Sequence, residues 1–183
     1  MKSIIILGPA RVGKSTLASL LCEKYNLNYI SGDSIRNAFI NIYPELNYSS
    51  MNTIERIDFC NFIKWVTREN NIHLKREIHY VIDSAEISIE NAQKVFNDFL
   101  IIVIGAKDIS IDEMVKNIKK YDTELEWTYR CNEEELKIIA KETIGNSKKI
   151  YNDAEKNNVM YFDTSFDREK VYDKIVEYIE GNL

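Results

Sequence analysis

Cysteine, proline and glycine are all scarce in this sequence. Among 183 residues there are three cysteines, two prolines and six glycines. The cysteines, at positions 22, 60 and 131, are far apart and odd in number, which excludes a disulfide framework and the usual spacing of zinc ligands. They are typical of reduced thiols, so a cytoplasmic protein is expected. No stretch resembles a linker and no internal repeat is visible, which predicts one domain over residues 1–183.

Long apolar runs and an excess of positive charge are missing as well. No apolar run approaches the roughly 18 residues of a membrane-spanning helix, and Ile4–Leu7 is too short for the apolar part of a secretion signal. The 24 Lys and Arg residues stand against 29 Asp and Glu residues, which gives a formal net charge of −5. This balance argues against a partner that is nucleic acid. With 45% hydrophobic residues, the chain is expected to be globular, with no membrane association.

Short apolar runs alternate along the chain with longer segments of helical periodicity. The short runs predict five buried strands, at residues 3–7, 27–30, 78–83, 99–104 and 159–162. The helical patterns cover residues 14–25, 33–42, 53–68, 90–98, 112–121, 133–156 and 168–179. Strands that are each followed by helix predict a three-layer α/β fold with a parallel five-stranded sheet covered on both faces. Ligands of such sheets bind at the carboxyl ends of the strands.

The first predicted strand runs directly into a phosphate-binding loop. Residues 8–16 read GPARVGKST and fit the pattern G-x-x-x-x-G-K-[ST] at every fixed position, between a strand and a helix. Backbone N–H groups of such a loop converge on phosphate oxygens at the helix N-terminus. Gly13 permits the close backbone approach, Lys14 supplies a charge to the β- and γ-phosphates, and Ser15 offers a hydroxyl to Mg²⁺. The nucleotide-binding residues expected here are Gly8, Arg11, Val12, Gly13, Lys14, Ser15 and Thr16.

The Arg11 side chain has alternative positions, and the choice of nucleotide is restricted by a second segment. Arg11 can lie over a phosphate or a base, or its side chain can be solvated, and the solvated position is the favoured one. GTP is disfavoured as the nucleotide, because residues 105–108 read GAKD and lack the Asn-Lys-x-Asp spacing that reads guanine. ATP with Mg²⁺ is therefore the expected cofactor pair, with Lys14 as a catalytic residue.

Polar residues also follow the second predicted strand. Residues 31–36 read SGDSIR and begin a helix, so that Asp33 and Arg36 stand in its first turn at the carboxyl edge of the sheet. A carboxylate there can orient or deprotonate an acceptor hydroxyl, and a guanidinium can bind an anionic acceptor. Asp33 suits the cap of the helix equally well, with Gly32 as a turn residue. Both interpretations stay open on spacing alone.

The third predicted strand ends in Asp83. An acid at that edge can hold Mg²⁺ directly or through water, because the phosphate-binding loop faces the same edge. A helix cap or a turn residue is the alternative. Metal binding by Ser15 and Asp83 is the favoured interpretation.

The loop and the SGDSIR segment together resemble the nucleoside-monophosphate kinase group of P-loop kinases, adenylate kinase especially. In that group a Thr-Gly-Asp-x-Leu-Arg segment follows the loop by about two dozen residues. The resemblance implies a P-loop NTPase fold of the nucleotide-kinase type and an acceptor site in which Ser31 and Arg36 contact the acceptor. Adenylate kinases follow the aspartate of the third strand with Gly-Phe-Pro-Arg, whereas this chain has SAEI at 84–87 and no arginine. Glu86 is expected to bind a sugar or base hydroxyl, or to repel a second phosphate.

The resemblance also implies a lid and a base-binding loop. Kinases of this group close a basic lid over the transferred phosphoryl group, and the lid is expected at about residues 110–135, mainly in 122–132. Arg130 is its candidate arginine, a surface charge being the alternative. The loop after the fifth strand packs on adenine in the resembled kinases, which makes Thr164 and Ser165 candidates.

These features favour an ATP- and Mg²⁺-dependent phosphotransferase that acts on a small acceptor, expected to be a nucleotide or nucleoside. The expected partners are thus ATP and this acceptor. An NTP hydrolase or regulatory ATP-binding protein without a committed acceptor is the main alternative, and a nucleic-acid-handling enzyme is opposed by the acidic balance.

Overall fold

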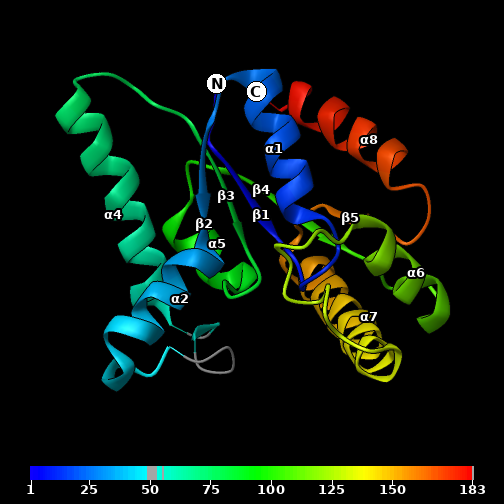
Figure 1. Cartoon of the computed structure of the whole chain (residues 1–183). Helices are drawn as coiled ribbons and strands as arrows, with labels where there is room; N and C mark the ends of the chain where they lie inside the picture. The colour runs from blue at the N-terminus through cyan, green and yellow to red at the C-terminus, as the bar shows by residue number, and fades with distance from the viewer. Residues whose placement is uncertain (49–52, 55, 183) are drawn as a thin grey trace.

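The structure is a computed structural model that describes residues 1–48, 53–54 and 56–182. Five parallel strands form one sheet in the order β2-β3-β1-β4-β5: β1 (Ile4–Leu7), β2 (Asn28–Ser31), β3 (Tyr80–Ser84), β4 (Leu100–Gly105) and β5 (Tyr161–Asp163). Figure 1 shows helices on both sides of this sheet. The predicted three-layer α/β fold with a five-stranded parallel sheet is therefore confirmed.

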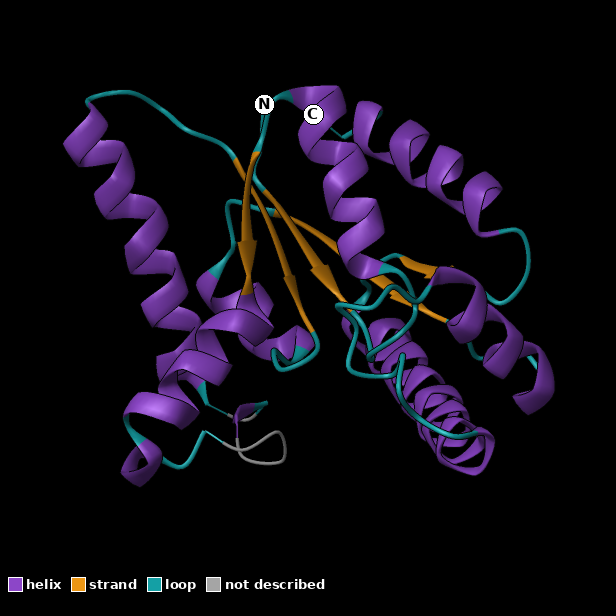
Figure 2. Cartoon of the chain, in the orientation of Figure 1, coloured by secondary structure: helices purple, strands orange, loops and turns teal. Residues whose placement is uncertain are grey.

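The helices follow the strands as the periodicity predicts. They are α1 (Lys14–Tyr25), α2 (Gly32–Ile42), α4 (Ile57–Leu74), α5 (Ile89–Val95), α6 (Ile111–Tyr121), α7 (Glu133–Asn157) and α8 (Arg168–Glu180), with a short 3₁₀ helix at Pro44–Leu46. Side chains cap several of them: Ser88, Ser110 and Asp167 accept a backbone N–H of the first turn, and Asn132 forms a capping box with Glu135. Figure 2 shows the strands in the centre with the helices around them.

The core lies on the two faces of the sheet. The residues of β1 are all fully buried and alternate between these faces. Ile4 and Ile6 pack with side chains of α1, α6 and α8, whereas Ile5 and Leu7 pack with side chains of α4 and α5. Because β1 is the central strand, the loop that follows it emerges in the middle of the carboxyl edge of the sheet.

Three details differ from the sequence prediction. The strands β2 and β5 are not buried: Asn28 and Tyr29 are exposed and β5 is half-buried, since both strands lie at the edges of the sheet. The helix expected at 53–68 is α4, which begins at Ile57 and continues to Leu74; residues 49–52 and 55 lie outside the described part of the chain. The helix expected at 90–98 ends at Val95, because Phe96 turns into the core.

The described helices do not meet the requirements of a membrane span. None of them is both long enough and apolar enough to cross a bilayer.

Candidate active site

The phosphate-binding loop connects β1 to α1, as the sequence predicts. Gly13 has φ +96°, which favours glycine, and a Cβ there would lie 2.2 Å from the hydroxyl of Tyr172. Lys14 begins the helix and is 6% exposed, and its Nζ donates to the carbonyl oxygen of Pro9 at 2.9 Å. Burial lowers the pKa of Lys14, and the nearby carboxylates of Asp33, Asp83 and Glu86 oppose that lowering. The lysine is thus enclosed by the loop, with negative charge on the neighbouring strand ends.

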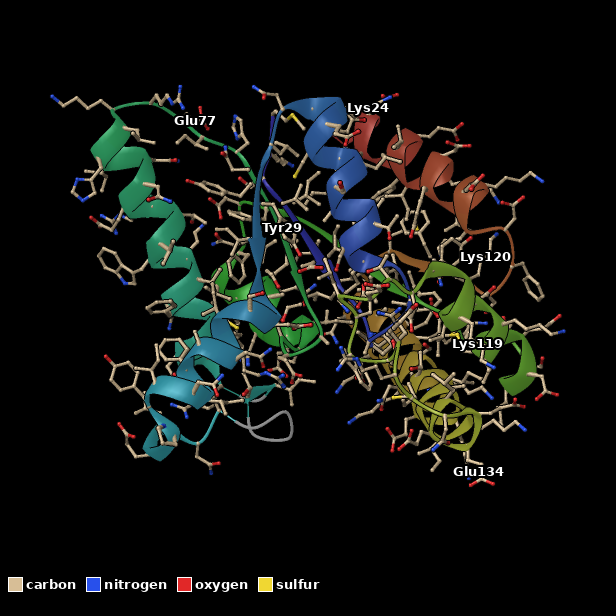
Figure 3. The ribbon with its side chains drawn as sticks, viewed as in Figure 1. Lys24, Tyr29, Glu77, Lys119, Lys120 and Glu134 are labelled. Carbon is tan, nitrogen blue, oxygen red and sulfur yellow. The ribbon has the colours of Figure 1, made fainter. Side chains whose placement is uncertain are left out.

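Ser15 and Asp83 are adjacent. The Ser15 hydroxyl donates to Oδ2 of Asp83 at 2.9 Å, and the Tyr29 hydroxyl donates to Oδ1 at 3.0 Å; Figure 3 shows Tyr29 on β2. Asp83 is 3% exposed, and burial raises its pKa, against the effect of the Lys14 charge. The structure therefore brings together the two predicted metal ligands and adds Tyr29, which the sequence analysis missed.

These two side chains fit a magnesium ion. A buried carboxylate with a raised pKa gains from a divalent cation, and the Ser15 hydroxyl offers a second oxygen. Among the described residues no group of three or more His, Cys, Asp or Glu side chains could hold a metal by itself. Mg²⁺ in phosphoryl-transfer sites takes one or two protein oxygens and completes its shell with phosphate and water. Ser15 and Asp83 match that requirement.

Asp33 does not cap its helix, contrary to one of the two interpretations above. The N-cap of α2 is Ser31, whose Oγ accepts the Ser34 N–H at 3.2 Å. The Asp33 carboxylate instead accepts the Ala85 N–H at 3.1 Å and lies 3.5 Å from the Ser84 hydroxyl. It thereby joins the start of α2 to the loop after β3, at the edge where Lys14 lies. Asp33 remains a candidate for orienting an acceptor hydroxyl.

Arg36 and Glu86 form an ion pair. The Nη1–Oε1 distance is 2.7 Å, and the two side chains are only 15% and 11% exposed. A second guanidinium nitrogen of Arg36 donates to Oδ1 of Asn37 at 2.8 Å. The two predicted acceptor-binding residues thus lie together, and each already binds the other.

Arg11 is not solvated, and the favoured interpretation of its side chain is wrong. Its guanidinium contacts the carboxylates of Asp122 and Glu126, and the side chain is 11% exposed. Both acids belong to the segment that follows α6, the predicted lid at 122–132, which passes beside the phosphate-binding loop in Figure 1. Arg130 of the same segment is exposed, and no described residue accepts a hydrogen bond from it.

Thr164 and Ser165 lie in the loop after β5, where they were predicted to help bind the base. Both are buried, at 1% and 3% exposed. The Thr164 hydroxyl lies 3.1 Å from the Val12 carbonyl and 3.0 Å from that of Gly105. The Ser165 hydroxyl accepts the Asp108 N–H at 2.9 Å. These hydroxyls connect the phosphate-binding loop to the ends of β4 and β5.

Two residues of α8 also reach this loop, and the sequence analysis missed both. The Tyr172 hydroxyl donates to the Gly13 carbonyl at 2.8 Å. Arg168 is 7% exposed, donates to the Arg11 carbonyl at 3.4 Å and lies over the Tyr121 ring at 4.4 Å; burial lowers its pKa. No motif marks these residues, since they meet the loop from more than 150 positions away.

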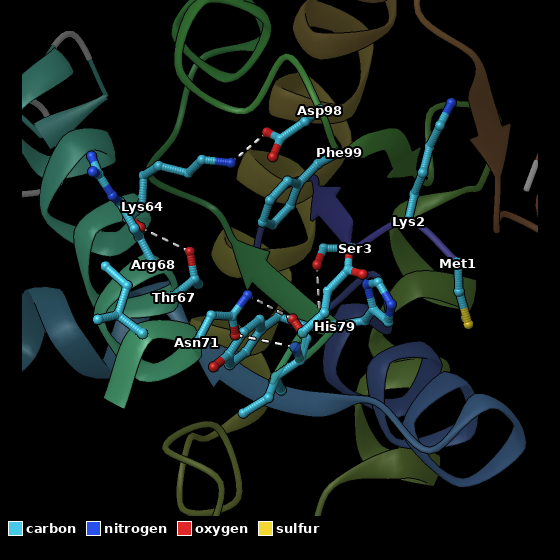
Figure 4. Close-up of a pocket in the computed structure, with 14 residues that line it drawn as sticks. Met1, Lys2, Ser3, Lys64, Thr67, Arg68, Asn71, His79, Asp98 and Phe99 are labelled. Atoms are coloured by element: carbon cyan, nitrogen blue, oxygen red, sulfur yellow. Dashed lines mark hydrogen bonds and ion pairs between the residues drawn. The ribbon is translucent and has the colours of Figure 1, made fainter. Parts of the chain in front are cut away.

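A cavity of about 600 Å³ lies at the opposite edge of the sheet, where the strands begin. Figure 4 shows Ser3, Lys64, Asn71, His79 and Phe99 around it. None of the candidate site residues lines it. The candidate active site is therefore confined to the carboxyl edge.

The fold is that of known small-molecule kinases. Over 98% of this chain and 99% of that chain, the structure resembles a shikimate kinase from Bacteroides thetaiotaomicron, with a TM-score of 0.56 and 14% sequence identity. A gluconokinase from Sinorhizobium meliloti 1021 matches over 99% and 97%, with a TM-score of 0.56 and 12% identity. A shikimate kinase from Acinetobacter baumannii in complex with shikimate matches over 100% and 94%, with a TM-score of 0.57 and 11% identity. No protein-family model matches the sequence, and no curated protein does so either.

At these identities the likeness establishes the fold, which is that of the P-loop NTPases. The predicted fold type is confirmed, and the particular likeness to adenylate kinase is not, because the solved structures reported above are shikimate kinases and a gluconokinase.

Proposed function

We propose that this protein is an ATP- and Mg²⁺-dependent kinase that transfers a phosphoryl group to a hydroxyl of a small molecule. The observation that carries the proposal is the 2.9 Å contact between Ser15 and Asp83 next to Lys14, within a complete phosphate-binding loop. This arrangement supplies a cation for the phosphates and two oxygens for the metal. The structurally similar shikimate kinases and gluconokinase support the same class of reaction.

Each residue has a role that follows from its position. The loop backbone and Lys14 bind the phosphates and stabilise the charge on the transferred group. Ser15 and Asp83 hold Mg²⁺, which draws negative charge from the phosphates when bound. Asp33 orients the acceptor hydroxyl and takes its proton. We place Arg130 in a lid over residues 110–135, where it would neutralise developing charge, and we propose that Thr164 and Ser165 support the base-binding loop.

The acceptor is proposed to be hydroxylated. Glu86 lies at the same edge as Asp33, and its carboxylate can accept hydrogen bonds from hydroxyls. An anionic acceptor would have to compete with Glu86 for Arg36, because these two side chains already pair at 2.7 Å. Shikimate and gluconate, after which the similar kinases are named, are hydroxylated carboxylates and would meet that competition. A nucleoside or nucleotide acceptor, contacted by Ser31 and Arg36, stays the alternative that the sequence suggests.

A panel of acceptors separates these possibilities. ADP release is measured with ATP and Mg²⁺ in the presence of shikimate, gluconate, uncharged sugars, nucleosides or nucleoside monophosphates, with Lys14→Ala as the inactive control. We expect at least one hydroxylated compound to accelerate release well above the rate without acceptor. If no compound does so and the basal rate depends on Lys14, the hypothesis of an NTP hydrolase replaces this proposal.

We also propose a cytoplasmic location, from the reduced cysteines alone.

A further inference from the structure

Arg11 has an unusual backbone conformation for a charged residue. Its φ is +66°, within the left-handed region where residues with a Cβ are strained. Such positions persist where surrounding contacts fix them, and they concentrate at functional sites. At Arg11 the surrounding contacts come from two sides: the backbone carbonyl accepts from Arg168 of α8, and the side chain is held by the segment 122–132.

The side-chain contact is an ion pair across the molecule. Nη1 of Arg11 lies 2.6 Å from Oε2 of Glu126, and Nη2 contacts Oδ1 of Asp122. The Asp122 side chain is 5% exposed and that of Glu126 is 41% exposed. One guanidinium thus joins two carboxylates of a distant segment, and one of these pairs is buried, where a charge-assisted hydrogen bond is strong.

The loop side of this contact is held firmly. The Arg11 carbonyl accepts from Arg168 at 3.4 Å, and the Ala10 carbonyl accepts from Thr143 at 3.4 Å. These donors belong to α8 and α7, so the loop backbone is fixed by two helices that do not include the 122–132 segment.

The segment side has few other attachments before its C-terminal end, where Cys131 packs partly buried against the core and Asn132 caps α7. Its backbone hydrogen bonds are local turns, such as the Glu126 N–H to the Thr123 carbonyl at 2.9 Å. Its large apolar side chains face outward: Leu125 is 97% exposed, Trp127 62% and Tyr129 52%. A segment with little buried apolar surface opens easily unless something else holds it. Thr128, 1% exposed, is its deeply buried residue.

We propose that Arg11 is a positioning residue that fastens the 122–132 segment to the phosphate-binding loop, and that this ion pair keeps the segment over bound nucleotide. The effect on nucleotide rests on the proposed function, whereas the fastening itself does not. Removing Arg11 would release the segment. It would also leave the carboxylates of Asp122 and Glu126 without their cation near the phosphates. The loss of the segment and the repulsion between like charges both weaken nucleotide binding.

The fastening is tested by limited digestion with chymotrypsin, which cleaves after Trp127 and Tyr129. Arg11→Gly and Arg11→Asn both remove the guanidinium and suit the positive φ, so neither disturbs the backbone. We expect both, and Asp122→Asn/Glu126→Gln, to speed cleavage by about tenfold, the size expected for one charge-assisted contact. The triple variant Arg11→Gly/Asp122→Asn/Glu126→Gln should add nothing further, because all three remove one interaction. The matched control Glu124→Gln, an exposed acid of the same segment, should leave the rate unchanged.

The coupling to nucleotide is tested by calorimetric titration with MgADP. Arg11→Gly and Asp122→Asn/Glu126→Gln should each raise the Kd at least about fivefold, with Arg11→Lys between them and the unaltered protein. Cleavage of Arg11→Gly at the unaltered rate overturns the fastening. Faster cleavage with an unchanged Kd overturns the coupling. Tighter binding in the double acid variant, with weaker binding in Arg11→Gly, also overturns it and leaves Arg11 as a direct phosphate contact. No MgADP binding by the unaltered protein overturns the proposed function instead, and the digestion result stands by itself.

Discussion

Among single residues, Lys14 has the environment most closely matched to phosphate binding. It is 6% exposed, its Nζ is bound to the loop carbonyl of Pro9, and burial lowers its pKa. A cation that is enclosed without a carboxylate in direct contact is ready to bind an anion. Its electrostatic function follows from this arrangement, and its packing contributes little.

Lys14→Ala should therefore lower turnover by about 10²–10³-fold, the usual effect of removing one group that stabilises transition-state charge. The melting temperature should stay equal or rise, because a buried charge is removed. ADP release with the best acceptor and a thermal melt measure the two effects. A variant with near-normal turnover would return the loop to a structural role.

Asp83 supports a prediction about pH. Burial raises the pKa of this carboxyl in the folded state, so the folded protein holds the proton more tightly than the unfolded chain. Stability from this group is thus present at low pH, below the ordinary carboxyl pKa, and is lost as the pH rises through the folded value. In EDTA at pH 7, Asp83→Asn should increase the free energy of unfolding, and the difference should shrink on acidification to about pH 4.

Urea unfolding at pH 7 and pH 4 checks the sign. Adding Mg²⁺ and ATP should stabilise the unaltered protein more than Asp83→Asn, since the variant has lost the charge that holds the ion. Equal stabilisation of both proteins would remove Asp83 from the metal site, and a less stable variant in EDTA would contradict the raised pKa of its carboxyl.

At the scale of elements, the start of α2 packs very closely on the end of β3. A Cβ at Gly32 would lie 2.8 Å from both Cβ and Oγ of Ser84, and 3.0 Å from the Asp83 carbonyl. This approach brings Asp33 to the Ala85 N–H. The glycine is thus needed for the position of α2, which carries the proposed acceptor residues Asp33 and Arg36.

Gly32→Ala should consequently destabilise the protein by about 1–3 kcal/mol and raise the KM of the acceptor more than that of ATP. Gly145→Ala is the matched control, because nothing lies within 4 Å of its added Cβ within helix α7. It should stabilise by about 0.5–1 kcal/mol. Chemical denaturation measures both. Similar stabilities for the two variants would contradict the close contact of α2 with β3.

Helix α8 supports the phosphate-binding loop from the other side. Removing the Tyr172 hydroxyl, which donates to the Gly13 carbonyl at 2.8 Å, should cost about 0.5–1.5 kcal/mol and weaken MgATP binding. Tyr178→Phe is the control on the same helix, because its hydroxyl has no hydrogen-bond partner among the described residues. Denaturant midpoints and calorimetry of Tyr172→Phe and Tyr178→Phe should differ; if they agree, α8 does not support the loop.

The same elements show what the sequence can and cannot predict. The loop and its two flanking elements follow from local spacing, and the contact between Ser15 and Asp83, the proposed metal ligands, follows because parallel strands end at one edge. The cap at Ser31 was missed because aspartate is as good a capping residue as serine, and Asp33 was the candidate. Only the close packing of Gly32 on β3 moves the start of the helix from residue 33 to residue 32. The Arg11 contact and the Tyr172 contact were missed because each joins residues over 100 positions apart.

For the whole molecule, the carboxyl edge gathers groups from α1, α2, β2, β3, the 122–132 segment and α8 around one loop. The edge where the strands begin carries the 600 Å³ cavity and none of these groups. This division is the reason to place nucleotide and acceptor together at one edge, where a phosphoryl group can pass between them.

The central claim is that phosphate leaves ATP for a small molecule and not for water. The most direct test is the stoichiometry of the reaction, with ADP and phosphorylated acceptor both measured by mass spectrometry in the presence of Mg²⁺ and the best acceptor. We predict one phosphorylated acceptor for each ADP, with both products absent in Lys14→Ala. ADP formed together with inorganic phosphate, without any phosphorylated acceptor, would contradict the account.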